Sequence, residues 1–538
     1  MSKKSFVQGA AVLAVAGIII KVLGACFRIP LGNMIGDEGM AYYQAAYPIY
    51  VLFLTLATSG IPIAISRMVS ERRAVGNYSE AHRVFKISFL LLFCIGAVSF
   101  GICFFGANII VGIIKMPEAV HAMRAVACAL LLVPVMAAFR GYFQGMQDMN
   151  PTAVSQVVEQ LFRVVLGLAL SYILLAKGTE YAAAGASFGA AAGAIGGLLA
   201  VWVIYVARRS KIKADIAAAE SANDKPEHEK GSAILWKIFT IAVPITIGAA
   251  IMPIMNFIDA GLVVSRLMEG GWSYLEAKQL YGQLTGFAGS LINFPQVLTQ
   301  SVAMSIVPAV AASYRLKDFD SLRNDVQVGL RIAIIVGIPC ALGLMTLARP
   351  ILVMLYPMRR EAAIGAAPCL AILAFGVIFL STIQTLTGVL QGVGKQMIPV
   401  RNLFIGAVAK VVITYALTGV HAINSKGAAV GTVAAYVIAA SLDLYAVKKY
   451  TGAGFDLGLT YLKPLVSGIA MSAVAFASYK VLAMLLGNSL ACVISVGLAA
   501  LTYGILLFAT RAITRDEVLR LPKGRKLVKI IDKFSKAH

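Results

Sequence analysis

The sequence has little charge. Asp, Glu, Lys and Arg make up 13% of its 538 residues, whereas about 25% is usual in a soluble domain. Hydrophobic residues make up 59%, and the mean hydropathy is +0.83. They gather in uncharged runs such as 5–20 and 493–509, and about 18 apolar residues suffice to cross the hydrocarbon core of a bilayer. The scarcity of charge therefore excludes a large soluble domain and predicts an integral membrane protein.

Two motifs of catalytic and ATP-hydrolysing proteins are also missing. There is no HExxH, and the string nearest to a Walker A motif, GVLQGVGKQ at 388–396, lacks both the spacing and the final Ser or Thr. The seven cysteines show no CxxC spacing, which argues against a zinc site and against a disulfide framework. We therefore expect a secondary-type membrane transporter rather than an enzyme, with no organic cofactor and no confident metal site.

The apolar runs predict an all-α integral membrane fold with about fourteen transmembrane helices. The expected spans are 5–29, 41–67, 84–106, 119–145, 151–176, 182–206, 233–266, 280–313, 326–348, 362–391, 397–419, 427–447, 461–486 and 489–510.

The basic residues indicate the orientation of these spans. The net charge is +22, and Lys and Arg gather in alternate loops, at 67–83, 207–213, 315–323 and 448–449. Basic residues that lie between apolar spans follow the positive-inside rule, so nucleic acid is not the expected partner. Arg349, Arg359 and Arg360 break the trend. The majority predicts a multi-pass protein of the bacterial plasma membrane with both termini in the cytoplasm.

Two hydrophilic segments interrupt the apolar pattern. Residues 207–232 are charged and poor in large apolar side chains, which predicts a flexible cytoplasmic linker. Residues 511–538 carry eight Lys and Arg residues after the first arginine, with Leu and Ile interleaved at helical spacing. This pattern predicts a basic amphipathic tail on anionic membrane lipids, and a solvated tail is the alternative for its last residues.

The halves on either side of the linker resemble each other. RGYFQGMQDMNP at 140–151 matches TGVLQGVGKQMIP at 387–399, GASFG at 185–189 matches GAAVG at 427–431, and SGIPIAISR at 59–67 matches SIVPAVAAS at 305–313. We therefore expect an N-terminal lobe at 1–206 and a C-terminal lobe at 233–450. Six helices in each lobe would be related by a pseudo-twofold axis around a central cavity. Residues 451–510 fall outside the repeat.

Ionisable residues within the spans are candidates for the site, because burying a charge in the membrane is costly. Lys21 and Arg28 lie almost on one face of the first span, and either form a cationic wall or snorkel to the interfaces. Glu159 and Arg163 are an i,i+4 pair that is either structural or part of the site. Lys410 lies in the eleventh span. Because these basic residues outnumber the acidic ones, we expect an anionic cargo.

The seventh span offers a candidate for ion coupling. Asn256 and Asp259 lie three residues apart, so that they share a helix face. Asp259 either binds a cation together with Asn256 or neutralises Lys410, and the sequence leaves both readings open.

The sequence resembles a known family. KVLGACFRIPLGNMIGDEGMAYYQAAYPIYVLFLTLATSGIPIAISRMVSE at 21–71, SQVVEQLFRVV at 155–165 and LTGVLQGVGK at 386–395 are similar to the MurJ/SpoVB-type proteins. These belong to the multidrug/oligosaccharidyl-lipid/polysaccharide (MOP) exporter superfamily. The resemblance spans nearly the whole chain.

The resemblance implies a flippase that exports lipid II, an undecaprenyl-pyrophosphate-linked peptidoglycan precursor, by alternating access. It also implies a cationic cavity, onto which Lys21, Arg28 and Arg67 map, and a groove for the lipid tail in the last two spans. A sodium-binding aspartate of some members maps onto Asp259. The family's acidic ligand in the eleventh span is not evident, and Lys410 lies in that region. Sodium and the membrane potential therefore remain alternative sources of coupling.

The alternatives are a flippase for another polyprenyl-linked polysaccharide precursor and a drug–cation antiporter of the same superfamily. The two additional spans and the basic residues argue against the antiporter. We expect a monomer.

Overall fold

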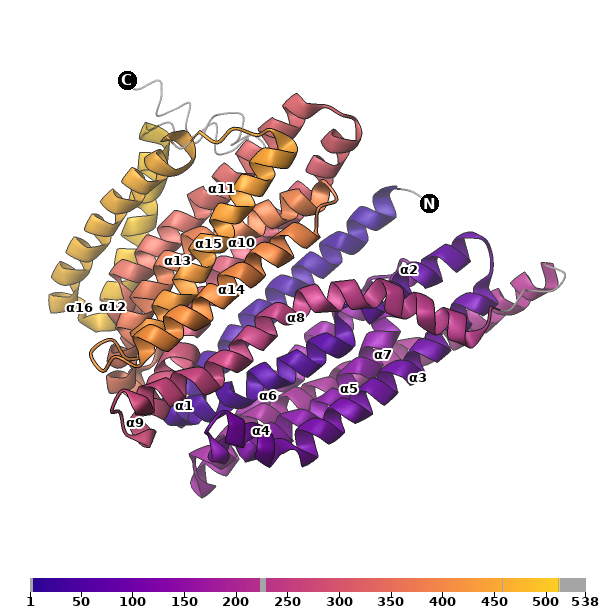
Figure 1. Ribbon diagram of the computed structural model, residues 1–538, viewed down its shortest axis with the longest axis horizontal. Coiled ribbons are helices and arrows are strands. Elements are labelled where there is room, and N and C mark those ends of the chain that lie inside the picture. Colours follow the sequence, from indigo (N-terminus) through magenta and orange to yellow (C-terminus); the bar gives the residue numbers. More distant parts are fainter. Residues whose placement is uncertain (1–2, 223–228, 457, 511, 513–538) are drawn as a thin grey trace. The chain divides into compact units, whose positions relative to one another are not determined.

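The computed structural model describes residues 3–222, 229–456, 458–510 and 512, and the elements in these ranges are all helical (Figure 1). Eleven helices of the described part are long and apolar enough to cross a membrane. The predicted all-α membrane fold is thus confirmed, whereas the count of fourteen spans stays a prediction. The predicted tail at 511–538 lies outside the described residues, apart from Ala512.

The chain forms two compact units, Met1–Gly282 (unit 1) and Gln283–His538 (unit 2). Unit 1 therefore includes the seventh predicted span, which the sequence assigned to the C-terminal lobe. Its helices, indigo to magenta in Figure 1, are α1 (Lys3–Thr58), α2 (Ile61–Ala74), α3 (Tyr78–Phe105), α4 (Ala107–Ile113), α5 (Val120–Gly145), α6 (Asn150–Leu174), α7 (Thr179–Ala222), α8 (Gly231–Glu269) and α9 (Tyr274–Gly282), with 3-10 turns at Pro117–Ala119 and Leu175–Lys177.

A sharp bend at Gly36 folds α1 back on itself. Gly36 has φ 70° and ψ −170°, a conformation that only glycine adopts readily. Phe27 and Tyr43 flank the bend, and a straight helix would separate residues 16 positions apart by about 24 Å. Their ring centroids are instead 6.0 Å apart. The two arms of α1 therefore form a hairpin, which accounts for the first two predicted spans.

Helix α7 is much longer than the predicted sixth span. It continues as a helix to Ala222, so most of the predicted flexible linker at 207–232 is helical. The side chains explain why, because Ala, Lys and Glu, which dominate this segment, are strong helix formers even where no packing supports them. Arg208 on this extension pairs with Asp148, which lies just before α6.

Unit 2 is built around α13. Its helices are α10 (Gly289–Arg315), α11 (Phe319–Thr346), α12 (Ala348–Leu355), α13 (Arg360–Gly392), α14 (Met397–Thr418), α15 (Lys426–Thr451) and α16 (Lys463–Ala509), with π-helical turns at Gln283–Ala288 and Gly458–Leu462 and a 3-10 turn at Pro357–Arg359. Helix α13 contacts α10, α11, α12, α14 and α15, and its residues are largely apolar and buried.

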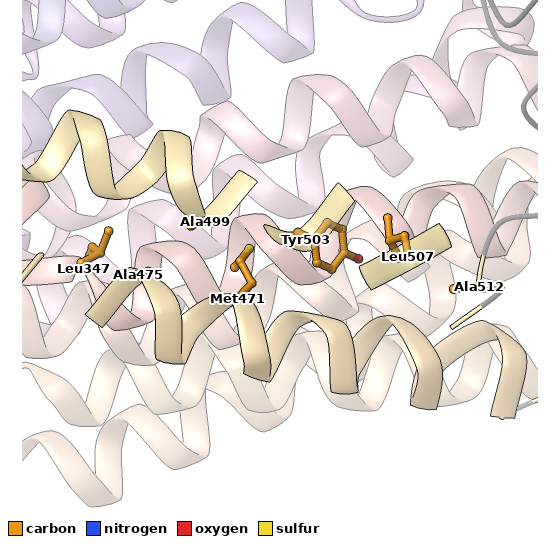
Figure 2. Packing of buried hydrophobic residues seen from close by; sticks show 7 residues of the cluster. All are labelled: Leu347, Met471, Ala475, Ala499, Tyr503, Leu507 and Ala512. Atoms are coloured by element: carbon orange, nitrogen blue, oxygen red, sulfur yellow. The ribbon is translucent and has the colours of Figure 1, made fainter. Parts of the chain in front are cut away.

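Helix α16 is a second hairpin, bent at Gly487 with φ 73° and ψ 173°. Met471 on one arm and Tyr503 on the other meet in one apolar cluster (Figure 2). The Tyr503 hydroxyl donates to the carbonyl oxygen of Ile335 on α11 at 2.9 Å. The two predicted spans outside the repeat therefore form a paired element that docks on α11.

The internal repeat is visible in the packing of each unit. In unit 1, a methyl group added at Gly189 would lie 2.8 Å from the carbonyl oxygen of Arg163. In unit 2, a methyl group at Gly431 would lie 3.1 Å from the carbonyl oxygen of Lys410. The helix pairs α6–α7 and α14–α15 thus approach each other through glycine at matching points, as the GASFG and GAAVG match predicts.

The turn that follows α5 matches the turn that follows α13. Each turn holds one residue at positive φ, Gln147 at 61° and Gly394 at 77°. The N–H of the next residue, Asp148 or Lys395, donates to the carbonyl oxygen five residues earlier, at 3.0 and 2.8 Å respectively. The predicted repeat match at this turn is therefore confirmed.

The third predicted match has the wrong register. A methyl group at Gly141 would lie 3.2 Å from the Cβ of Ile65, and one at Gly388 would lie 3.1 Å from the Cγ2 of Ile306. These contacts pair residues 241 positions apart, whereas the match of SGIPIAISR with SIVPAVAAS pairs residues 246 positions apart. Gly141 and Gly388 themselves are 247 residues apart, so the chain between the two contact points is six residues longer in unit 2, and a match that keeps an offset near 247 misses the true contact.

Candidate functional site

Three tyrosines line one face of the second arm of α1. Tyr43, Tyr47 and Tyr50 follow each other at four- and three-residue spacing, which places them on the same side of a helix. The ring centroids of Tyr43 and Tyr47 are 5.7 Å apart and stacked, and those of Tyr47 and Tyr50 are 6.0 Å apart. The row therefore presents phenol rings along the inside of the α1 hairpin.

Two arginines meet this row. The guanidinium carbon of Arg28, on the first arm of α1, lies 5.9 Å from the centroid of the Tyr47 ring, within the range of a cation–π interaction. The Nη2 of Arg163, on α6, donates to the Tyr50 hydroxyl at 3.4 Å. Arg28, Tyr43, Tyr47, Tyr50 and Arg163 form the arginine–tyrosine cluster of unit 1, which joins residues that the sequence places in three predicted spans.

Arg163 has a donor to spare. Its Nε is buried and has no hydrogen-bond partner among the described residues, although a buried N–H without an acceptor costs about 1–3 kcal/mol. The side chain as a whole is only half-buried, as are Arg28 and Tyr47. A group that brings acceptor oxygens and negative charge to this cluster would satisfy the donor, and phosphate oxygens suit the arginine fork especially well.

Glu159 pairs with a residue that the sequence reasoning missed. Its Oε2 accepts from the Nη2 of Arg140 on α5 at 2.9 Å, and both side chains are largely buried. The Nε of Arg140 also donates to the Ser155 hydroxyl at 2.8 Å. The predicted partner Arg163 bonds to Tyr50 instead. Arg140 is an ionisable residue within an apolar span, which is the signal that would have found it.

Lys21 and Arg67 lie at exposed positions. Lys21 precedes Arg28 by seven residues on the first arm of α1. Arg67 lies on α2 and pairs with Glu71 on the same helix, with 2.8 Å between Nε and Oε1. Their predicted role at the cavity wall stays a prediction.

The two candidate residues for ion coupling lie on α8 of unit 1, and Lys410, the alternative partner of Asp259, lies in unit 2. Asn256 is exposed and Asp259 half-buried on α8 of unit 1, whereas Lys410 is buried on α14 of unit 2. Within the described residues, no group of three or more His, Cys, Asp or Glu side chains is placed to hold a metal ion. The coupling role of Asn256 and Asp259 therefore also stays a prediction.

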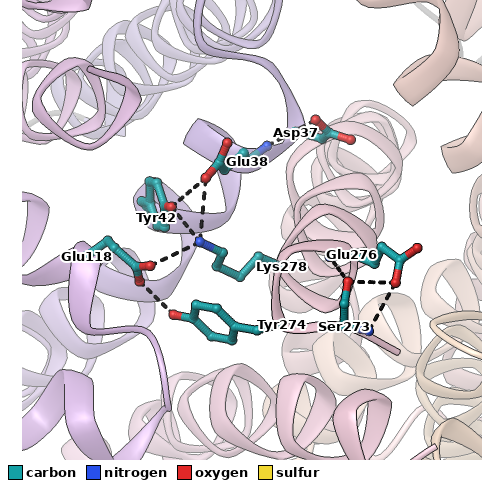
Figure 3. A network of polar contacts seen from close by, with 8 residues as sticks. All are labelled: Asp37, Glu38, Tyr42, Glu118, Ser273, Tyr274, Glu276 and Lys278. Atoms are coloured by element: carbon teal, nitrogen blue, oxygen red, sulfur yellow. Dashed lines mark hydrogen bonds and ion pairs between the residues drawn. The ribbon is translucent and has the colours of Figure 1, made fainter. Parts of the chain in front are cut away.

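A second polar cluster, also missed by the sequence reasoning, lies next to the Gly36 bend (Figure 3). Lys278 on α9 is 4% exposed, and its ammonium group is its polar end. It donates to the Tyr42 hydroxyl at 2.7 Å and pairs with Glu118 at 3.1 Å and with Glu38 at 3.5 Å. Tyr274 donates to the other oxygen of Glu118 at 2.6 Å.

This Lys278 network ties α9 to the bend of α1. The backbones also touch, because a methyl group at Gly282 would lie 1.9 Å from the carbonyl oxygen of Asp37. Every charged group of the network has an opposite charge or a phenol as its partner, so the network is a structural clamp rather than a site with unused binding capacity.

The string GASFG at 185–189 has the spacing of the nucleophile elbow of hydrolases. An elbow requires a strand-to-helix turn that exposes the serine. Here the string lies inside α7 with Ser187 buried, and its two glycines pack against α6. The string is therefore a helix-packing element.

Comparisons with known proteins agree with this architecture. A family model described as "Polysaccharide biosynthesis protein" matches residues 6–314, and the model MatE matches residues 244–416. The chain is 27% identical over 90% of its length to "Lipid II flippase MurJ" of Bacillus subtilis (strain 168), of which it covers 90%. It is 26% identical over 98% of its length to "Stage V sporulation protein B" of the same organism, of which it covers 100%.

A solved structure titled "Lipid II flippase MurJ, inward closed conformation" shares the fold, with a TM-score of 0.68 and 15% identity over 92% of this chain and 97% of that chain. The family model covers more than half of the sequence, and the two relatives cover nearly all of it. The chain therefore belongs to the polysaccharide biosynthesis protein family and is a MurJ/SpoVB-type member of the MOP superfamily, as its sequence motifs predict.

Proposed function

We propose that this protein is a flippase that exports a lipid-linked cell-wall precursor, lipid II, from the inner to the outer leaflet of the bacterial plasma membrane by alternating access. The arginine–tyrosine cluster carries the proposal. Arg28 and Arg163 supply positive charge, and three phenols and the spare Nε–H of Arg163 supply polar partners. This combination suits a pyrophosphate, which has several negatively charged acceptor oxygens and no donors at neutral pH.

Such a carrier would lower the free-energy cost of removing water from the headgroup of the lipid. The sugars, peptide and pyrophosphate of the headgroup would each lose water in hydrocarbon at high cost. A polar, basic path lowers this cost while the lipid tail stays in the bilayer. The relative named as a lipid II flippase supports the cargo class. The α16 hairpin is our candidate for the element that receives the lipid tail.

The proposal extends to energetics and topology. With the cytoplasm negative, outward movement of each negative charge is favoured by about 2.3 kcal/mol per 100 mV, so the potential alone would drive export. Sodium at Asn256 and Asp259 is the alternative. Both termini are proposed to be cytoplasmic, the protein monomeric, and the basic tail bound to anionic lipids. No step requires covalent chemistry.

The test is complementation. The endogenous lipid II flippase of a bacterium is depleted, this chain is expressed, and labelled lipid II on the outer leaflet is measured. We expect growth and outer-leaflet lipid II to be restored by the wild type and lost with Arg163→Ala at equal membrane abundance. Arg323→Ala is the matched control, because Arg323 is an exposed arginine paired with Asp320 in unit 2.

A second cargo class has one specific observation in its favour, the description of the matching family as polysaccharide biosynthesis proteins. Failure of complementation with good membrane expression, together with flipping of a different polyprenyl-linked glycan in vesicles, would replace lipid II by that glycan. Full activity of Arg163→Ala with either cargo would remove the arginine–tyrosine cluster from the binding site. Efflux of drugs without flipping of any lipid would favour the antiporter class.

A further inference from the structure

Unit 2 buries one carboxyl group with unusually little support. Asp443 on α15 is 1% exposed. Its Oδ1 accepts a hydrogen bond from the Nδ2 of Asn402 on α14 at 2.8 Å, and Asn402 is itself fully buried. Its Oδ2 is buried and has no hydrogen-bond partner among the described residues. A carboxylate that is held by one neutral donor has exchanged several water molecules for a single hydrogen bond.

The orientation of the Asn402 amide is fixed from the other side. Arg401 donates to the Oδ1 of Asn402 from Nη2 at 3.3 Å and from Nε at 3.4 Å. The amide therefore turns its NH₂ group toward Asp443. Arg401 itself is exposed, and no ion pair between Asp443 and a basic residue occurs in the described part of the chain.

The elements packed against α15 carry basic residues, but none of these forms an ion pair with Asp443 in the described part of the chain. These elements are α14, α13 and, at one end, α11. Helix α13 has no ionisable residue between Glu361 and its end except Cys369, which contacts Ser425 at the opposite end of α15. The other titratable or charged groups on these elements are Arg401, Lys410 and Tyr415 on α14, Asp320, Arg323, Asp325, Arg331 and Cys340 on α11, and Lys426, Tyr436, Tyr445, Lys448, Lys449 and Tyr450 on α15 itself.

The immediate neighbours are apolar. Ala439 and Ala440, about one turn before Asp443, form a buried cluster with Ile383 of α13, and Leu403 and Phe379 pack against it. Burying an isolated carboxylate in such surroundings costs several kcal/mol, even after the protein has relaxed around it. A buried carboxyl group of this kind therefore takes up a proton and becomes neutral. The neutral acid is therefore the form that this environment favours.

Unit 1 shows that the fold does not need a carboxyl group at this place. The repeat matches Gly431 with Gly189, and the same 242-residue offset matches Asp443 with Val201, which is fully buried. Valine fills the position with no electrostatic cost. A residue that costs stability and that the matched helix pair lacks is a candidate for function.

We propose that Asp443 is a proton-binding site of unit 2, occupied in the conformation described here and emptied when water reaches its Oδ2. Binding adds H⁺ to the carboxylate to give the neutral acid, and release returns H⁺ to water, with no other reactant. The role in transport rests on the proposed function: one such proton is taken up and released in each transport cycle. The sequence leaves sodium and the membrane potential as alternative sources of coupling. Proton binding at Asp443 would be a third source.

The test follows the carboxyl group itself. Infrared difference spectra of the purified full-length protein in liposomes, recorded between acid and alkaline pH, report the C=O stretch of protonated carboxyl groups. We expect a band that persists at neutral pH in the wild type, is absent in Asp443→Asn and Asp443→Val, and is shifted in frequency in Asp443→Glu. Asp325→Asn is the matched control, because Asp325 accepts from the Ser313 hydroxyl at 3.2 Å in the same unit. This control should keep the band.

Three outcomes would overturn the proposal. The first is a neutral-pH spectrum without a band that depends on Asp443, with the Asp443→Val protein folded by its thermal unfolding curve. The second is loss of the band on adding sodium at constant pH, which would make Asp443 a metal-cation ligand. The third is unchanged pH dependence of transport in Asp443→Asn, which would remove the coupling role. The infrared result does not depend on the cargo, so it stands or fails separately from the lipid II assay.

Discussion

The helix pairs α6–α7 of unit 1 and α14–α15 of unit 2 have the same packing and different chemistry. In both pairs, two glycines four residues apart let the backbones touch: Gly185 and Gly189 in unit 1, Gly427 and Gly431 in unit 2. The side chains around these contacts have diverged. The matched positions are Ser155 and Asn402, Glu159 and Gly406, Arg163 and Lys410, and Val201 and Asp443.

Each unit also buries a polar bridge next to its helix pair, in a different place. In unit 1 the bridge joins α5 and α6 through Arg140 and Glu159. In unit 2 it joins α14 and α15 through Asn402 and Asp443, and the position that matches Arg140 is Thr387. The glycines preserve the scaffold, because any larger residue would separate the helices. The polar positions are free to specialise, unit 1 for charge and unit 2 for a neutral acid.

The largest expected difference between the two pairs concerns the matched basic residues. Arg163 uses Nη2 on Tyr50 and its Nε has no partner among the described residues. Arg163→Lys should therefore lower lipid transport about tenfold, because one ammonium nitrogen replaces the planar fork of separate donor nitrogens. Lys410→Arg should stay within about twofold, because a point charge is replaced by another cation. Vesicle-based flipping at equal protein amounts measures both. Equal losses would mean that the two positions are used alike.

The buried bridge of unit 1 is expected to tolerate loss of both members better than loss of one. Glu159→Ala should lower the free energy of unfolding by about 3 kcal/mol, because Arg140 keeps a buried charge without its partner. The double variant Arg140→Thr with Glu159→Ala, which imitates unit 2, should recover most of this loss. Denaturant unfolding in detergent provides the values. Losses that add, with Arg140→Thr alone as the third variant, would show that the two side chains are not energetically coupled.

The glycine contacts should behave alike in both units. Gly189→Ala and Gly431→Ala each place a methyl group close to a backbone carbonyl, and each should cost about 1–3 kcal/mol of stability. Gly454→Ala is the control, since a methyl group there has no neighbour within 4 Å. A marked difference between the first two variants in thermal unfolding would argue that the repeat is preserved more strictly in one unit.

The smallest effect is expected at an exposed pair. Arg67 and Glu71 have side chains 64% and 56% exposed, so Glu71→Ala should change stability by less than about 1 kcal/mol. Arg67→Ala should be equally mild in unfolding experiments. A transport defect in Arg67→Ala with normal stability would then report contact with the cargo, and normal transport would remove Arg67 from the cationic wall.

Much of the helical pattern follows from the sequence, because hydropathy and length decide where a helix spans. The gap at 30–40 between the first two predicted spans holds the Gly36 bend, and the gap at 487–488 holds the Gly487 bend. The repeat can also be predicted from the sequence, because the spacing of the glycines indicates where two helices contact each other. What the sequence does not contain is the pairing of side chains from distant helices.

Glu159 illustrates this limit. Helical spacing offers Arg163 as its partner, one turn away, and the fold supplies Arg140 from a different helix. The Lys278 network is a stronger case, because its members Glu38, Glu118 and Lys278 come from three segments up to 240 residues apart. Each of them looks like an ordinary interfacial charge until the chain is folded.

The hairpin of α1 also has a consequence for how the chain enters the membrane during synthesis. Arg28 and Tyr47 meet across the bend at Gly36 and are 19 residues apart in the sequence, so the two arms of α1 are synthesised one directly after the other. An arginine that enters the bilayer alone would carry an insertion penalty of about 2.5–3.5 kcal/mol. If the two arms insert together, the arginine arrives already facing an aromatic partner, and the first pair of spans becomes a single unit of biogenesis.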